Sequence, residues 1–368
     1  MEKRHRMGFI EDFDKIRERF TALWNREILD RCCISVFAYD QQAMADFSSM
    51  PPGMDPRVWM TDPEIMQKRH LQLFEKTYFA GDAFPLVNLN LGPSGHTAFI
   101  QDVSPKYEAD TNTIWYSPIM EEELEPEKIL FDKNAYLYTQ TLACARFLTA
   151  HADGKYLVSM PDLAGNLDVL SNLRTPTELA ADLISDEETV EECLDRIEMI
   201  WETAVRECYE VLRKQEGAAD GSCIGWLNTW APGFHNQMQV DMSVMFSNDC
   251  YERFARKELE RQSSLLDYAL YHLDGVEQLR HLDTLLSIPD LRMIQWTNVA
   301  GQPSRLQYIP AFKKMQEAGK CLLILCETYE VETLLTELSS KGLLLNVKVG
   351  SREEADAMVR LAEKLTYE

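Results

Sequence analysis

The segment YALYHLDG (268–275) places two ionisable side chains at the end of an apolar run. Successive side chains of a β-strand point to opposite faces, so His272 and Asp274 face the same way and the apolar residues between them face the other. An imidazole and a carboxylate on one strand face can act as an acid/base pair or bind one metal ion. The alternative is an ordinary core strand with a polar end.

Eight short apolar runs occur along the chain, and intervals long enough for a helix separate most of them. They are residues 32–40, 83–95, 155–165, 223–233, 267–275, 291–301, 320–327 and 342–350. Strands that alternate with helices indicate repeating β-α units and a parallel sheet. Eight is the strand number of a (β/α)8 barrel. The sequence therefore predicts an α/β protein, a single (β/α)8 TIM barrel with N-terminal helical elaborations.

Amphipathic helix patterns fill the intervals between these runs. Residues 185–215 open with Ser185 and three acidic residues and then carry apolar positions at a spacing of three to four, which predicts a capped helix. Residues 351–365 repeat that design. Residues 1–75 are expected to form an N-terminal helical extension with loops. Because no repeat or linker divides the chain, we expect one domain over residues 1–368.

Charge and cysteine content narrow the classes of protein. The chain has 60 acidic and 37 basic residues and a net charge of −23, which argues against a surface for nucleic acid or anionic membrane. No segment approaches the roughly 20 apolar residues of a membrane span, and the N-terminus lacks the apolar core of a signal peptide. The nine scattered cysteines include no CxxC pair, which favours a reducing compartment. These features predict a cytoplasmic protein.

Polar and aromatic side chains follow the expected strands, where a barrel of this type carries its functional groups. We expect the following residues to line the mouth: Asn88, Asn90, Asp162, Asp168, Trp226, Trp230, Asp241, Gln295, Trp296 and Glu327. Indole faces and carboxylates attract positive charge, and amides fix orientation, so the lining suits a small neutral or cationic methylated compound. The alternatives are that the tryptophans fill the barrel interior and that Asp162 and Asp168 cap a helix.

Two common kinds of chemistry have no motif in the chain. There is no GxGxxG after a strand and no GxxxxGK[ST], the arrangements that present backbone amides to phosphate groups. A GxSxG elbow for a serine hydrolase is also missing. The sequence therefore does not support a nucleotide cofactor or a Ser-His-Asp hydrolase.

Several long segments resemble the uroporphyrinogen decarboxylase superfamily. The resemblance is carried by MPDLAGNLDVLSNLRTPTELAADLISDEETVEECLDRI (160–197), by QVDMSVMFSNDCYERFARKELERQSSLLDYALYHLDG (239–275), by GLLLNVKVGSREEADAMVRLAEKL (342–365) and more weakly by REILDRCCISVFA (26–38). Members of that superfamily share a (β/α)8 barrel and include cobalamin-dependent methyltransferases. The chain looks more similar to the barrels of trimethylamine and corrinoid systems than to the porphyrinogen decarboxylases.

The resemblance implies a metal site whose ligands differ here. The superfamily's zinc methyltransferases carry a His-x-Cys pair on the strand that matches YHLDG and a cysteine on the last strand. His272 matches the histidine, Asp274 stands where the first cysteine belongs, and LLLNVKV holds no cysteine. A carboxylate makes a harder site than a thiolate, so a divalent metal such as zinc would be held by His272, Asp274 and an oxygen ligand such as Glu327.

The resemblance implies a methyl-group transferase that moves a methyl group between a small methylated compound and a corrinoid bound to a partner protein. His272, Asp274 and Asp168 are the expected catalytic residues. A porphyrinogen decarboxylase is disfavoured, because that family binds carboxylates with an arginine-rich segment and this chain offers Arg26 and Arg31 without that motif. The remaining alternative is a barrel that binds a small molecule and performs no chemistry.

Overall fold

The computed structural model describes residues 7–108 and 110–367. The strands are β1 (Cys33–Tyr39), β2 (Thr77–Gly81), β3 (Leu86–Val87), β4 (Pro105–Glu108), β5 (Thr113–Tyr116), β6 (Leu157–Val158), β7 (Ser222–Ile224), β8 (Thr229–Ala231), β9 (His235–Met238), β10 (Tyr268–Asp274), β11 (Leu291–Thr297), β12 (Cys321–Cys326) and β13 (Leu343–Val349). The α-helices are α1 (Phe13–Trp24), α2 (Gln41–Ser48), α3 (Pro56–Thr61), α4 (Pro63–Phe74), α5 (Tyr136–Ala150), α6 (Asn166–Arg174), α7 (Pro176–Ser185), α8 (Glu187–Leu212), α9 (Asn248–Cys250), α10 (Arg256–Leu265), α11 (Leu282–Ser287), α12 (Ile309–Glu317), α13 (Val331–Glu337) and α14 (Arg352–Leu365).

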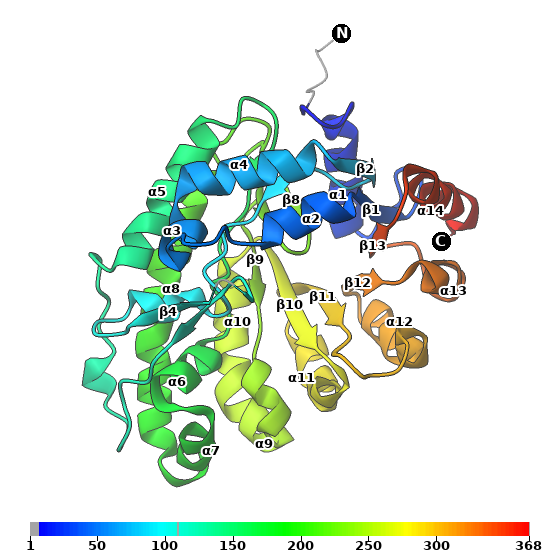
Figure 1. The fold of residues 1–368 in the computed structure, drawn as a ribbon. Helices are drawn as coiled ribbons and strands as arrows, with labels where there is room; N and C mark the ends of the chain where they lie inside the picture. Colours follow the sequence, from blue (N-terminus) through cyan, green and yellow to red (C-terminus); the bar gives the residue numbers. More distant parts are fainter. Residues whose placement is uncertain (1–6, 109, 368) are drawn as a thin grey trace.

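A large, mainly parallel sheet forms the centre of the molecule, in the strand order β2-β1-β13-β12-β11-β10-β9. All its pairings are parallel except that of β1 with β2. A second parallel ladder joins β3 to β6, and a bridge between Met160 and Ile224 continues it to β7. Figure 1 shows helices such as α8, α11, α12 and α14 outside these strands. The arrangement is consistent with an α/β barrel, and closure of the ring between β3 and β1 and between β7 and β9 stays a prediction.

Each of the eight predicted runs overlaps a strand, but the fourth prediction, residues 223–233, is wrong in extent. There the chain reverses after β7 and returns as the antiparallel strand β8. The turn is closed by Asn228, whose backbone N–H bonds to the carbonyl of Gly225 (3.2 Å) and whose φ is +51°, a conformation that asparagine tolerates. The unpredicted strand β9 therefore occupies the position beside β10.

The helix predictions hold best near the C-terminus. Helix α14 follows Ser351, whose side chain accepts a hydrogen bond from the N–H of Glu354 as a capping residue should. The predicted start at Ser185 is wrong, because Ser185 ends α7 and the long helix α8 begins after Asp186. The N-terminal extension contains α1 to α4, and its first six residues lie outside the described part of the chain.

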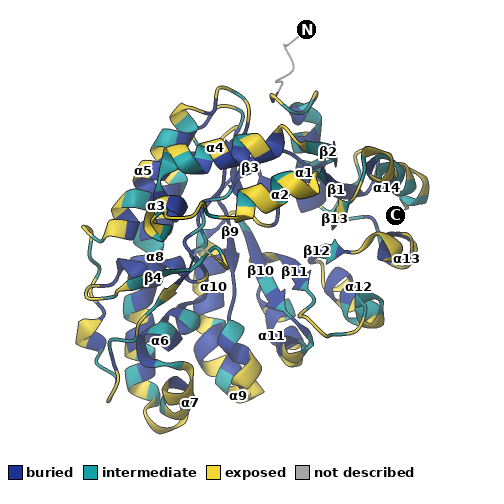
Figure 2. Cartoon of the chain, in the orientation of Figure 1, coloured by how far each residue is buried: buried dark blue, intermediate teal, exposed yellow. Residues whose placement is uncertain are grey.

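The two faces of the central strands have different partners. Tyr271 and Trp296 belong to the larger apolar core, which lies between the sheet and the helices. Leu270 and Met293 face the other way and join a second apolar core with Trp24 of α1, which covers the amino ends of the strands. Figure 2 shows the strands buried and the outer sides of the helices exposed. None of the described helices is both long and apolar enough to cross a membrane.

We expect Trp296→Ala to lower the free energy of unfolding by about 3–5 kcal/mol, the cost of emptying a large buried site. Trp296 is fully buried, and its ring packs against Tyr308 and Phe312 at centroid distances of 4.8 and 5.3 Å. Urea unfolding measures the change. Trp115→Ala is the control, because Trp115 is 48% exposed and its loss should cost much less. Equal losses would contradict the assignment of Trp296 to the helix-facing core.

Candidate functional site

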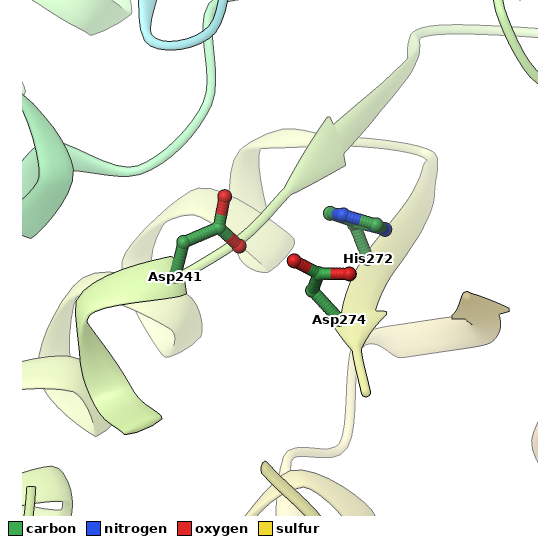
Figure 3. Close-up of side chains that lie close together, drawn as sticks. All are labelled: Asp241, His272 and Asp274. Atoms are coloured by element: carbon green, nitrogen blue, oxygen red, sulfur yellow. The ribbon is translucent and has the colours of Figure 1, made fainter. Parts of the chain in front are cut away.

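Asp241, His272 and Asp274 form a compact group at the carboxyl ends of two neighbouring strands. One potential ligand atom from each residue lies within 4.8 Å of those of the other two. His272 and Asp274 come from β10, and Asp241 begins the 3-10 turn η3 (Asp241–Met245) that follows β9. Figure 3 shows the three side chains pointing toward one another. Two carboxylates and one imidazole at this spacing can bind a divalent cation.

Gln295 fixes the imidazole of His272. The Oε1 atom of Gln295 lies 2.5 Å from Nδ1 of His272, and the Nε2 atom of Gln295 donates to the hydroxyl of Thr297 (2.8 Å). Because the amide oxygen faces the imidazole, Nδ1 must carry the proton, and Nε2 is then the nitrogen with a free lone pair. The arrangement prepares Nε2 of His272 to act as a metal ligand or a base.

A line of hydrogen bonds along β9 holds the carboxylate of Asp241. Trp226 donates from Nε1 to Gln237 (2.5 Å), Gln237 donates to Gln239 (3.3 Å), and Gln239 donates to Oδ2 of Asp241 (3.1 Å). Trp226 also packs edge-on against His272, with 5.0 Å between ring centroids. The Oδ1 atom of Asp241 is buried and has no hydrogen-bond partner among the described groups. That oxygen remains available to a ligand.

Asp168 sets the position of the turn that carries Asp241. Its two carboxylate oxygens accept hydrogen bonds from the backbone N–H groups of Asp241 (3.0 Å) and Met242 (2.8 Å). Asp168 lies in the first turn of α6. Gly165, whose φ is +79°, directly precedes this helix. A Cβ atom at Gly165 would lie 2.1 Å from Oδ2 of Asp168, so only glycine leaves room for this carboxylate.

The carboxyl groups of the site are buried away from water and repel one another. Burial, and then the charge of Asp241, raise the pKa of Asp162 to about 7. The same two causes raise the pKa of Asp168 well above its usual range. Burial also raises the pKa of Asp241, with a further contribution from Asp274 and an opposing one from His272. A bound cation would relieve this repulsion.

The other residues expected at the mouth are spread over several environments. Gln295 and Trp226 contact His272 as described, whereas Trp296 faces the helices and Trp230 lies in the core at the amino ends of the strands. Asn88 accepts a hydrogen bond from Ser159 (3.3 Å). Asn90 holds its own loop by donating to the carbonyl of Asn112 (2.6 Å) and accepting from the N–H of Gly92 (2.8 Å).

Glu327, the third metal ligand proposed from the sequence, lies outside the group of Asp241, His272 and Asp274. Its side chain is 61% exposed and lies 4.0 Å from Arg305, and it caps the turn after β12. Asp241, expected as a substrate-binding residue, occupies the place beside His272 and Asp274 instead. Sequence periodicity did not indicate this closeness to His272 and Asp274, because β9 (HNQM) contains no alternating apolar pattern.

Neither arginine that the sequence offered for binding carboxylates faces this group. Arg31 is buried in an ion pair with Asp82, with Nη1 2.6 Å from Oδ2. Arg26 donates to the carbonyl of Gln316 (2.9 Å) at the end of α12. Both guanidinium groups are therefore already engaged, and recognition of a polycarboxylate at the site would need other cations.

The comparisons with known proteins give a likeness of fold. No protein-family model matches the chain, and no curated protein matches it in sequence. Among solved structures, a methyltransferase from Methanosarcina mazei matches with a TM-score of 0.61 at 10% sequence identity. The match covers 95% of this chain and 98% of that chain. The chain has the fold of that methyltransferase. The methyltransferase-like fold therefore extends over nearly the whole chain.

We expect Gly165→Ala to disturb the site as well as the stability, because the new methyl group must displace the carboxylate of Asp168. Gly53→Ala is the matched control: Gly53 has a φ of +80° and open space around its Cβ position. The control should lose only about 1–2 kcal/mol of unfolding free energy for its left-handed backbone. Gly165→Ala should lose more and also bind divalent metal more weakly, as calorimetry measures. Equal behaviour of the two variants would contradict the role given to Asp168.

We expect the metal-free protein to lose stability as the pH rises from 5 to 8. A carboxyl group with a raised pKa in the folded state stabilises the fold fully below its unfolded pKa and loses that effect as the pH rises through its folded pKa, about 7 for Asp162. Urea unfolding in a chelator at several pH values measures the loss. Asp162→Asn should reduce it, whereas Asp290→Asn, an exposed control, should not. An unchanged pH profile in Asp162→Asn would contradict this assignment.

Proposed function

We propose that the protein is a methyl-group transferase with a (β/α)8 barrel, related to the uroporphyrinogen decarboxylase superfamily. It moves a methyl group between a small methylated compound and a corrinoid carried by a partner protein. The observation that carries the proposal is the group of Asp241, His272 and Asp274 at the carboxyl ends of β9 and β10, in a chain with a methyltransferase fold. In α/β barrels this end of the strands carries the chemistry. The corrinoid partner follows from the resemblance in sequence and not from any contact in the structure.

The three side chains fit a divalent metal such as zinc. A catalytic zinc ion takes three protein ligands and keeps a fourth position open for substrate. Nε2 of His272 and one carboxylate oxygen from each aspartate supply such a set, and the unpartnered Oδ1 of Asp241 is one of the candidate atoms. A metal ion held there would act as a Lewis acid on an atom of the substrate that carries a lone pair.

The surrounding residues orient this set and shield it. Gln295 keeps the proton of His272 on Nδ1, and Asp168 fixes the backbone from which Asp241 projects. Trp226 covers one edge of the imidazole and is 36% exposed, so it also offers an apolar surface to a substrate. Asp168 is thus a positioning residue in this proposal, and His272, Asp241 and Asp274 touch the metal or the substrate.

We expect the protein to bind one zinc ion per chain with His272, Asp241 and Asp274 as ligands. His272→Ala and Asp274→Asn should each reduce bound metal strongly, measured by elemental analysis of protein purified without chelator and by zinc titration. Glu327→Gln is the matched control and should bind like the parent protein, because its side chain lies away from the group. Gln295→Leu should weaken binding by about 10–100-fold, the usual effect of removing a ligand's supporting hydrogen bond.

Metal that is absent, or unchanged in His272→Ala, would overturn the metal site. The transfer itself has a separate readout, the visible spectrum of the corrinoid when protein, methylated compound and a reduced corrinoid protein are mixed. Methylation of the corrinoid that depends on His272 is the expected result. Stoichiometric metal and ligand binding without any spectral change would favour the non-catalytic binding protein instead.

A further inference from the structure

A cavity of about 260 Å³ lies next to the group of Asp241, His272 and Asp274. Its walls come from β5, from the first turns of α6 and from η3, and Asp241 and Asp168 are part of them. The volume is near the lower end of the range for small-molecule sites, about 300–1,000 Å³. The cavity is therefore large enough for a small substrate whose reacting end lies at Asp241.

The electrostatics of this cavity favour a positive ligand. None of the described residues that line it is lysine or arginine, and its two carboxyl groups are those of Asp168 and Asp241. Asp162 lies close enough to feel the charge of Asp241, and its Oδ1 atom is buried without a hydrogen-bond partner among the described groups. A divalent ion between Asp241 and Asp274 would balance those two charges, whereas no cationic side chain among the described lining residues lies beside Asp168.

The start of α6 does not turn the cavity into an anion site. A helix N-terminus attracts anions through its free N–H groups, but the N–H of Asn166 already donates to the buried carboxylate of Glu258 (2.9 Å). Asp168 adds a second carboxylate in the same turn. The positive end of this helix therefore already lies beside two carboxyl groups of the protein, those of Glu258 and Asp168.

Apolar side chains form the outer rim of the cavity. Trp115 is 48% exposed and Met245 is 55% exposed, which is unusual for residues of this size. The indole of Trp115 is held by a hydrogen bond from Nε1 to Glu108 (2.6 Å), so its orientation is fixed. An aromatic face beside carboxylates recognises methylated ammonium groups, whose charge is spread over apolar methyl surface.

We propose that this cavity binds the methylated ammonium group of a cationic substrate, and that it selects such compounds over neutral and anionic methyl donors. The inference rests on the proposed function, since it names the substrate class of the same site. The aromatic contact in this proposal comes from Trp115 at the cavity rim. Trp230 and Trp296, which the sequence suggested for this contact, face two apolar cores instead.

The test compares three compounds with the same branched head group and different charge. Choline carries a positive nitrogen, 3,3-dimethyl-1-butanol has carbon in its place, and 3,3-dimethylbutanoate is an anion. Calorimetry is done on the full chain as purified and again after loading with zinc, without any corrinoid protein. Choline should bind about tenfold tighter than the neutral alcohol, or more, and the anion should bind weakest. Equal affinities, tighter binding of the anion, or no binding of any probe would overturn the proposal.

Two exposed aromatic residues provide a matched pair of variants. Trp115→Leu keeps an apolar rim and removes the aromatic face, so it should lower the preference for choline over the alcohol severalfold. Tyr329→Leu removes an aromatic ring that is 67% exposed and lies outside the cavity lining, and it should leave the preference unchanged. An unchanged preference in Trp115→Leu would also overturn the proposal.

The readout separates this inference from the proposed function, because binding requires no methyl transfer. A charge preference without methylation of a corrinoid overturns the proposed function and leaves the ammonium site. Methylation of a corrinoid without a charge preference overturns the ammonium site and leaves the proposed function.

Discussion

The hydrogen bonds from the backbone of Asp241 and Met242 to the carboxylate of Asp168 connect the parts of the site. They join the start of α6 to the turn after β9, and so bring a carboxylate beside the two side chains that β10 supplies. Because both oxygens of that carboxyl group accept a backbone N–H, the turn is held at two points. Their geometry depends in turn on Gly165, which leaves the space that the carboxylate occupies.

The same contact gathers carboxyl groups whose repulsion a bound cation would relieve. Placing Asp162, Asp168 and Asp241 together costs free energy, since burial and mutual repulsion raise the pKa of each carboxyl group. Proteins accept such a cost where a ligand later supplies the opposite charge. A metal ion at His272 and an ammonium group in the adjacent cavity would together supply this positive charge. None of the described residues of the cavity wall is a lysine or arginine that could supply it.

The sequence predicted the part of the site that local periodicity determines. Alternation along β10 was enough to place His272 and Asp274 on one face. The expectation that Gln295 and Trp296 both line the mouth was wrong for Trp296, which lies in the larger apolar core, because adjacent residues of a strand face opposite ways. Asp241 was expected at the mouth, but its place beside His272 and Asp274 could not be predicted, because β9 is a buried strand made largely of polar residues whose partners come from elsewhere in the fold. His235, for example, is paired with Thr229 and with the carbonyl of Tyr268. A hydrophobic pattern cannot reveal a strand of that kind.

Anomalous X-ray diffraction at the zinc absorption edge, from crystals of the zinc-loaded protein, tests the central claim most directly. The account predicts one strong peak between Asp241, His272 and Asp274, about 2.0–2.2 Å from Nε2 of His272 and from the two carboxylates. The cavity walled by Asp168 and Met242 should adjoin the remaining coordination position. No peak at that place, or a peak bound by other residues while these three side chains stay apart, would contradict it.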